Sequence, residues 1–288
     1  MRVAITGASG FIGRYVLERL KSGSFDLVVL GRTRPVGYEG AFVETDLFRP
    51  EPFVDFHSIG ATHLLHMAWY AEHGDYWSSP RNAIWAASTH HIIESFCSAG
   101  GQKVVVTGTC AEYDWSAGDC LEYSTSLAPS SIYGMAKCLA RGLTEMVCDR
   151  YSVKYAWGRI FVPVGAGEDR RRLLPSLMDL FRGRRAPFPV SMSSERDFLH
   201  ASDVAAGLEA LLLPQATGCY NICSGDATKI SEVVKMVASM FGADPDLVSA
   251  NIHADPAPRV VGDNRRLQAL GWCQQRSLPQ VLANELAW

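Results

Sequence analysis

The sequence lacks an excess of charge of either sign. In 288 residues, 27 lysines and arginines stand against 30 aspartates and glutamates, which gives a formal net charge of −3. Binding to a nucleic acid or to an anionic membrane surface depends largely on a basic field, because both partners are dense in negative charge. The composition therefore predicts no nucleic-acid partner and no membrane partner.

Long apolar runs and paired cysteines are missing as well. No stretch approaches the roughly 18 apolar residues of a membrane-spanning helix, so we expect none. The opening segment Met1–Ile5 carries no basic leader, and this predicts no signal peptide and a cytoplasmic location. The eight cysteines form no Cys-x-x-Cys pair, which favours reduced thiols and no metal site.

What the sequence does contain is an alternation of short apolar runs with helix-like stretches. The runs are Val3–Ile5, Leu27–Leu30, Leu64–Ala68, Val104–Val106 and Tyr155–Phe161, and the helix-like stretches are Phe11–Leu20, Trp85–Cys97 and Ile132–Arg150. Fully apolar runs of this length are typical of parallel strands that are covered on both faces. The repeated βαβ pattern predicts an α/β fold with a doubly wound parallel sheet of the Rossmann type.

The alternation breaks after Phe161, where proline, glycine and arginine become frequent. We therefore expect a smaller C-terminal lobe to begin here. In this division residues 1–163 form the sheet with its cofactor site, and a segment around 196–224 returns to that sheet. Residues 164–195 and 225–288 form the lobe.

A glycine-rich loop follows the first apolar run and opens the first helix. Glycines at this place permit a tight turn, a close approach of the backbone to a phosphate, and close packing of the helix on the strand. The N-terminus of the helix offers free N–H groups and the positive end of a dipole to a pyrophosphate. The loop predicts a dinucleotide site in which the cofactor contacts are Gly7, Ser9, Gly10, Phe11, Ile12 and Gly13.

The end of the second apolar run favours the phosphorylated form of the cofactor. An NAD site usually carries a carboxylate there, about 20 residues beyond the loop, to bind the adenosine ribose. This chain has Gly31 followed by Arg32 and Arg34. Two guanidinium groups suit a 2′-phosphate, so we predict NADPH, with solvated surface arginines as the alternative. The further cofactor contacts that we expect at neighbouring strand ends are Asp46, Leu47, Met67 and Ala68.

Thr109, Tyr133 and Lys137 form the candidate catalytic set. Tyr133 and Lys137 are four residues apart, hence on one face of a helix, where an ammonium group favours the phenolate and lets the phenol exchange a proton. Thr109 ends the run Val104–Val106, at the sheet edge where doubly wound folds bind ligands. Its hydroxyl can hydrogen-bond a reacting oxygen, although threonine also commonly closes a strand.

Aromatic residues are concentrated between Trp69 and Trp77, where Tyr70 and Tyr76 also lie. We expect this segment beside the nicotinamide, where flat rings can stack on a base or a sugar. Ordinary loop packing or a dimer contact is the alternative. His66, near the end of the preceding apolar run, is interpreted as a hydrogen-bonded core histidine.

Together these residues resemble the extended short-chain dehydrogenase/reductase family, in its branch of nucleotide-sugar reductases and epimerases. The motifs that follow the family's order are the glycine loop, Thr109 with Tyr113, Tyr133 with Lys137, Arg159-Ile160-Phe161, Arg196-Asp197-Phe198-Leu199-His200, Asp203-Val204-Ala205, Tyr220-Asn221-Ile222 and Leu270-Gly271-Trp272. The resemblance implies a nucleoside-diphosphate-sugar substrate in the C-terminal lobe, and a homodimer in which two helices of each subunit pair. Arg196 resembles the family's diphosphate-binding arginine, with a pair to Asp197 as the alternative.

The residues after Thr109 separate the reactions that the resemblance implies. A 4,6-dehydratase carries Asp-Glu directly after this hydroxyl, and a GDP-fucose synthase carries a cysteine two residues after it. This chain has Cys110-Ala111 instead. We interpret Cys110 as a buried thiol directed elsewhere. A 4-epimerase tends to have an asparagine at Val162 and an acidic residue at Gly31. The substrate contacts that we expect are Trp69, Tyr70, Thr109, Cys110, Ala111, Phe161 and Arg196.

These differences lead to one predicted reaction and two alternatives. The sequence predicts an NADPH-dependent ketoreductase that reduces the 4-keto group of an NDP-4-keto-6-deoxyhexose, with Tyr133 as the general acid. The runner-up is an NAD(P)-dependent NDP-sugar 4-epimerase. A non-catalytic NADP-binding regulator is a further alternative, because this type of fold also hosts such functions.

Overall fold

The largest element of the computed structural model, which describes residues 1–48, 54–250 and 258–284, is a seven-stranded parallel sheet. Every strand pair in it is parallel. The strands, in the order in which they lie side by side, are β12 (Gly218–Ile222), β7 (Lys154–Ile160), β5 (Lys103–Thr109), β4 (His63–His66), β1 (Arg2–Thr6), β2 (Asp26–Gly31) and β3 (Ala41–Glu44). The order reverses between β1 and β4, and ligands of such sheets bind outside the carboxyl ends of the strands at this point.

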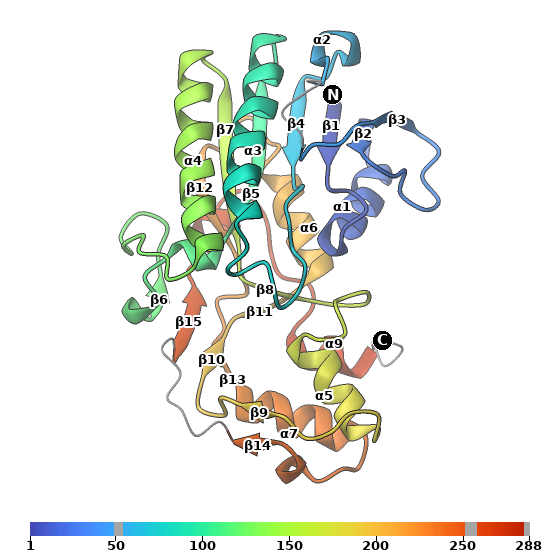
Figure 1. Ribbon diagram of the computed structural model, residues 1–288, viewed down its shortest axis with the longest axis vertical. Helices are drawn as coiled ribbons and strands as arrows, with labels where there is room; N and C mark the ends of the chain where they lie inside the picture. The colour runs from blue at the N-terminus through green and yellow to red at the C-terminus, as the bar shows by residue number, and fades with distance from the viewer. Residues whose placement is uncertain (49–53, 251–257, 285–288) are drawn as a thin grey trace.

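Helices cover both faces of the sheet (Figure 1). On one face α1 (Phe11–Lys21) packs against α6 (Ala201–Ala210), and on the other α3 (Arg81–Ser98) packs against α4 (Ile132–Arg150). Each pair buries its apolar side against the strands in a separate cluster of core residues. The predicted doubly wound α/β fold is therefore confirmed, and the bounds of α4 are those expected from the sequence.

A third apolar cluster lies in the lower part of Figure 1, away from the large sheet. It is built by α5 (Leu173–Phe181), α7 (Ile230–Met240) and α9 (Leu278–Asn284). Strand β8 (Val162–Val164) follows directly on β7, and strand β11 (Phe198–His200) directly precedes α6. The two strands pair in parallel. Part of the expected lobe, residues 251–257 and 285–288, lies outside the described residues.

The remaining elements are short. They are α2 (Phe56–Ile59), α8 (Arg265–Gln268), β6 (Asp119–Cys120), β9 (Pro189–Val190), β10 (Glu195–Arg196), β13 (Thr228–Lys229), β14 (Ser249–Ala250), β15 (Arg259–Gly262) and single 3₁₀ turns at Cys110–Glu112, Trp115–Ala117 and Pro245–Leu247. None of the helices in the described part of the chain is both long enough and apolar enough to cross a membrane.

Candidate active site

A cavity of about 540 Å³ lies at the reversal point, between the loops that follow β1 and β4. Most of the residues expected at a cofactor or substrate site line it: Gly7, Ser9, Gly10, Phe11, Ile12, Gly13, Arg32, Asp46, Leu47, Met67, Ala68, Trp69, Thr109, Cys110, Tyr133, Lys137, Phe161 and Arg196. The structure does not place Arg34, Tyr70 and Ala111 in this wall. The cavity therefore joins the glycine loop and the candidate catalytic set in one space.

The glycine loop has no room for side chains at two positions. A Cβ on Gly7, whose φ is +75°, would lie 2.7 Å from the backbone nitrogen of Ala68, and one on Gly13 would lie 2.0 Å from the carbonyl oxygen of Gly7. Helix α1 begins after Gly10, and no side chain caps its first turn. Its uncapped N–H groups suit an anion, so the loop fits the pyrophosphate of a dinucleotide.

The two arginines after β2 have different surroundings. Arg32 is exposed and lines the cavity beside Gly31, where an added Cβ would meet nothing within 4 Å. Arg34 instead donates to the carbonyl oxygen of Gly40 at 2.7 Å, and its guanidinium lies 5.0 Å from the centre of the Phe42 ring. Of the two arginines, only Arg32 lines the cavity, whereas Arg34 holds the loop between β2 and β3.

The three candidate catalytic residues line the same part of the cavity. The Lys137 ammonium donates to the carbonyl oxygen of Thr107 at 2.8 Å and lies 3.9 Å from the centre of the Trp69 ring. The Thr109 hydroxyl accepts a hydrogen bond from the backbone N–H of Ala111 at 3.2 Å, which leaves its own proton available to another acceptor.

Burial dominates the protonation of Tyr133 and Lys137. It raises the pKa of Tyr133, against the opposing effect of a hydrogen bond with Thr109. Burial also lowers the pKa of Lys137 to about 7, and the ammonium lies 6.0 Å from the centre of the Tyr133 ring. The expected phenolate is thus not favoured here. Tyr133 is a neutral phenol at neutral pH, which is the form that can donate a proton.

Aromatic rings surround Tyr133. Its ring meets Trp69, Tyr76 and Trp77 edge to face, with centroid distances of 6.4, 5.0 and 5.7 Å. The hydroxyl of Tyr70 donates to Asp75 at 2.6 Å instead. The aromatic segment therefore lies around Tyr133, except that Tyr70 is turned away by a local acceptor.

The two residues after Thr109, both expected as substrate contacts, differ in their surroundings. Cys110 lines the cavity, although the sequence favoured a thiol directed elsewhere. Burial raises its pKa to about 12, so it is a neutral thiol at neutral pH. Ala111 is buried under α4, where a Cβ on Gly134 would come within 2.3 Å of its carbonyl oxygen. Neither residue is a general base.

A buried ion pair behind Thr109 was not predicted from the sequence. Glu112 accepts hydrogen bonds from the Thr109 N–H at 2.9 Å and from the Trp157 indole at 2.8 Å. Its other oxygen accepts from Arg159 at 2.7 Å, and both side chains are at most 1% exposed. The available signal was a glutamate inside an apolar stretch, with an arginine inside the strand that pairs with β5. The pair fixes the backbone that carries Thr109.

Two arginines stand where the cavity meets a second one of about 330 Å³. Arg172 and Arg196 line both spaces, and Arg172 is ion-paired with Glu168 at 2.8 Å. Asp197, the alternative partner of Arg196, accepts hydrogen bonds from the backbone N–H groups of Ser224 and Gly262. Two guanidinium groups at a junction suit a diphosphate that links a group in each cavity.

His66 is confirmed as a core histidine. Its ring nitrogens lie 2.8 Å from the Thr6 hydroxyl and 3.1 Å from the Thr89 hydroxyl. Burial lowers its pKa to about 3, so the ring is neutral at neutral pH, and both of its nitrogens are occupied by core hydroxyl groups.

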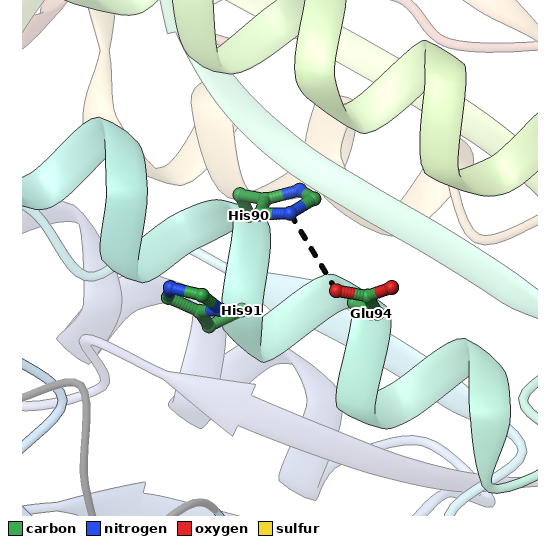
Figure 2. Close-up of side chains that lie close together, drawn as sticks. All are labelled: His90, His91 and Glu94. Atoms are coloured by element: carbon green, nitrogen blue, oxygen red, sulfur yellow. Dashed lines mark ion pairs between the residues drawn. The ribbon is translucent and has the colours of Figure 1, made fainter.

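A cluster of two histidines and a glutamate lies on α3, outside the cavity (Figure 2). The potential ligand atoms of His90, His91 and Glu94 lie within 4.8 Å of one another. Glu94 also pairs with Arg150 at 3.2 Å, and a guanidinium there opposes a metal cation. The cluster takes no part in the candidate active site.

Known proteins resemble this chain over nearly its whole length. A dTDP-6-deoxy-L-talose 4-dehydrogenase (NAD(+)) of Aggregatibacter actinomycetemcomitans is 24% identical over 82% of this chain and 88% of that protein. A trifunctional UDP-glucose 4,6-dehydratase/UDP-4-keto-6-deoxy-D-glucose 3,5-epimerase/UDP-4-keto-L-rhamnose-reductase of Arabidopsis thaliana is 23% identical over 99% of this chain, which spans only 47% of that protein.

A solved structure and a family model complete the comparison. The structure of MoeE5 in complex with UDP-glucose and NAD matches with a TM-score of 0.86 and 24% identity, over 100% of this chain and 98% of that one. The model of the NAD dependent epimerase/dehydratase family matches residues 3–223. The resemblance noted in the sequence is therefore confirmed, and the chain belongs to the NAD dependent epimerase/dehydratase family.

Proposed function

We propose that the protein is an NADPH-dependent reductase of the 4-keto group of an NDP-4-keto-6-deoxyhexose. The observation that carries this proposal is the position of Thr109, Tyr133 and Lys137 in one cavity with the glycine loop, while the neutral pair Cys110-Ala111 follows Thr109. Such a site holds a proton donor for a carbonyl oxygen. It has no acid and base after Thr109 with which to eliminate water.

The roles of the three residues follow from their surroundings. NADPH, when bound at the glycine loop, supplies the hydride. Tyr133 donates its phenolic proton to the carbonyl oxygen of the sugar, and Thr109 donates a hydrogen bond to the same oxygen as negative charge develops on it. Lys137, held by the Thr107 carbonyl, would hold the nicotinamide ribose of the bound cofactor, and it carries a positive charge below about pH 7.

The substrate class is supported by the relatives and by the two arginines at the junction. Relatives named as dTDP-6-deoxy-L-talose 4-dehydrogenases act on the 4-position of a 6-deoxy nucleotide sugar, and others are named UDP-glucose 4-epimerases. In our proposal the diphosphate contacts Arg172 and Arg196, the nucleoside occupies the second cavity and the sugar lies beside Tyr133. A 4-epimerase remains the second candidate because of the latter relatives.

The test of the reaction is its stoichiometry. We expect the enzyme to consume about one NADPH per molecule of dTDP- or UDP-4-keto-6-deoxyglucose and to release the 4-hydroxy sugar, measured by absorbance at about 340 nm and by product mass. Conversion of UDP-glucose into its 4-epimer without net cofactor consumption would establish the epimerase instead. Cofactor binding without either reaction would favour the non-catalytic regulator.

The choice of NADPH is tested at Arg32. The variant Arg32→Ala is expected to weaken NADPH binding by roughly tenfold or more and to leave NADH binding nearly unchanged, because only NADPH carries the 2′-phosphate that a guanidinium would pair with. Arg34→Lys is the matched control and should change neither, since a lysine ammonium can keep the hydrogen bond to the carbonyl oxygen of Gly40. Equal losses for both cofactors in Arg32→Ala would assign Arg32 a structural role.

The homodimer is proposed through α3 and α4. Four large apolar side chains on α4 are exposed and fall on one stripe of the helix: Ile132, Met135, Leu139 and Met146, which are 44, 54, 55 and 56% exposed. A second copy that packs on this stripe across a two-fold axis would bury all four. We expect a dimer in light scattering at micromolar concentration.

The interface is tested by placing a charge in the stripe. Leu139→Glu should convert the dimer into a monomer, because a carboxylate would be buried without a partner. Leu213→Glu, at an exposed leucine outside α4, is the control and should remain dimeric. A monomeric wild-type mass would contradict the proposal.

A further inference from the structure

Tyr76 has no role in the reaction proposed above, yet it lies nearest to Tyr133 of the three aromatics around it. The two ring centroids are 5.0 Å apart at an angle of 89°. Tyr76 lines the cavity together with Thr109 and Cys110. A charge on the Tyr76 phenol would raise the pKa of Tyr133, and both residues line the same cavity.

A buried amide holds Tyr76 in this position. Asn82, on the first turn of α3, is fully buried. Its amide nitrogen donates to the carbonyl oxygens of Tyr76 at 2.6 Å and Ser79 at 3.0 Å, while its oxygen accepts from the Trp69 indole at 2.9 Å. A buried polar group with all these partners fixes the local backbone. The Tyr76 ring is therefore presented to the cavity by a rigid loop.

Two of the neighbouring indoles, those of Trp69 and Trp115, offer the cavity carbon surfaces. The indole N–H of Trp69 is bonded to Asn82, and that of Trp115 donates to the carbonyl oxygen of Cys110 at 2.8 Å. Within residues 1–48, 54–250 and 258–284, the hydroxyl of Tyr76 has no such partner among the hydrogen bonds of the structure. Burial raises its pKa to about 12, so the hydroxyl keeps its proton at neutral pH.

We propose that Tyr76 is a substrate-contacting residue that donates a hydrogen bond to a hydroxyl group of the hexose bound beside Tyr133. This inference rests on the proposed function, since it requires a nucleotide sugar in the cavity. Thr109 and Tyr133 are engaged with the reacting carbonyl oxygen, and the indole N–H groups of Trp69 and Trp115 are bonded within the protein. A hexose whose hydroxyls lost water on binding would need another partner, and the Tyr76 phenol is placed to supply it.

The experiment separates the sugar from the nucleotide. Wild-type protein, Tyr76→Phe and Tyr70→Phe are titrated by calorimetry with UDP and UDP-glucose and with dTDP and dTDP-glucose. Tyr70 is the matched control, because it lies on the same loop but its hydroxyl is bound to Asp75 and it does not line the cavity. Melting temperatures of the three proteins check that each is folded.

Tyr76→Phe is expected to bind the nucleotide sugar about 3- to 10-fold more weakly, the effect of one lost hydrogen bond, and to bind UDP or dTDP as wild type does. Tyr70→Phe should bind all of them unchanged. An unchanged affinity of Tyr76→Phe for the nucleotide sugar, or an equal loss for the nucleotide alone, would overturn the inference while leaving the proposed function in place. Wild-type protein that binds none of the four would overturn both.

Discussion

Replacing Tyr133 with phenylalanine is expected to lower turnover by about 10²- to 10⁴-fold, the usual contribution of a general acid. The substitution removes only the hydroxyl, so the edge-to-face contacts with Trp69, Tyr76 and Trp77 are retained and the fold should be unaffected. The measurement is kcat with NADPH and dTDP- or UDP-4-keto-6-deoxyglucose, together with the Kd for NADPH. We expect the Kd to change by less than about threefold.

Two further measurements test whether Tyr133 is the proton donor. Tyr70→Phe, which removes a phenol outside the cavity, should retain full turnover. The Tyr133 phenol should keep its proton between neutral pH and about pH 9, because burial raises its pKa. A fall in the wild-type rate over this range is therefore assigned to Lys137, whose pKa is about 7. Tyr133→Phe with turnover near that of wild type would show that another group donates the proton.

The features that the sequence predicted well depend on local patterns. The glycine loop must follow a strand and open a helix, and the clashes that a Cβ would meet at Gly7 and Gly13 are the physical reason for those residues. The helix Ile132–Arg150 starts where the Ser131 hydroxyl accepts from the N–H of Gly134 at 3.1 Å. Such signals lie within a few residues of one another, so they can be read from one sequence.

The features that could not be predicted depend on where a side chain turns. Arg34 and Tyr70 have the residue types expected of a site, but each is hydrogen-bonded within its own loop. Arg34 donates to the carbonyl oxygen of Gly40, and the Tyr70 hydroxyl donates to the Asp75 carboxylate. Cys110 and Ala111 follow Thr109 in a 3₁₀ turn, and only Cys110 lines the cavity. A motif defines which residues are near a site and leaves their rotamers open.

The Glu112–Arg159 pair is the clearest case of a feature outside the reach of sequence motifs, because its partners are 47 positions apart. Arg159 was noticed as a motif residue, but nothing local connects it with Glu112. In the structure the pair has further hydrogen bonds to Trp157 and to the phenol of Tyr113. A buried charge with this many partners is tolerated, whereas one without its counter-charge is strongly unfavourable.

Removal of Glu112 is therefore expected to be the most destabilising of these substitutions. Glu112→Leu should lower the free energy of unfolding by about 3–5 kcal/mol, because the Arg159 guanidinium would remain charged and buried beside an apolar side chain. Urea denaturation of the two proteins measures the difference. This loss of stability should be several-fold larger than that of Glu94→Leu. The latter removes a glutamate from an ion pair whose arginine is 70% exposed.

The double variant Glu112→Leu with Arg159→Met distinguishes the effect of the buried charges on stability from the effect of Glu112 on the position of Thr109. Because it removes both charges, it should regain much of the stability that either single variant loses. The N–H of Thr109 would still lack the acceptor that Glu112 provides, so the position of Thr109 should relax and kcat should stay low even in the restabilised protein. Stability and turnover that recover together would mean that the ion pair holds only the fold; recovery of stability alone would assign Glu112 the positioning of Thr109.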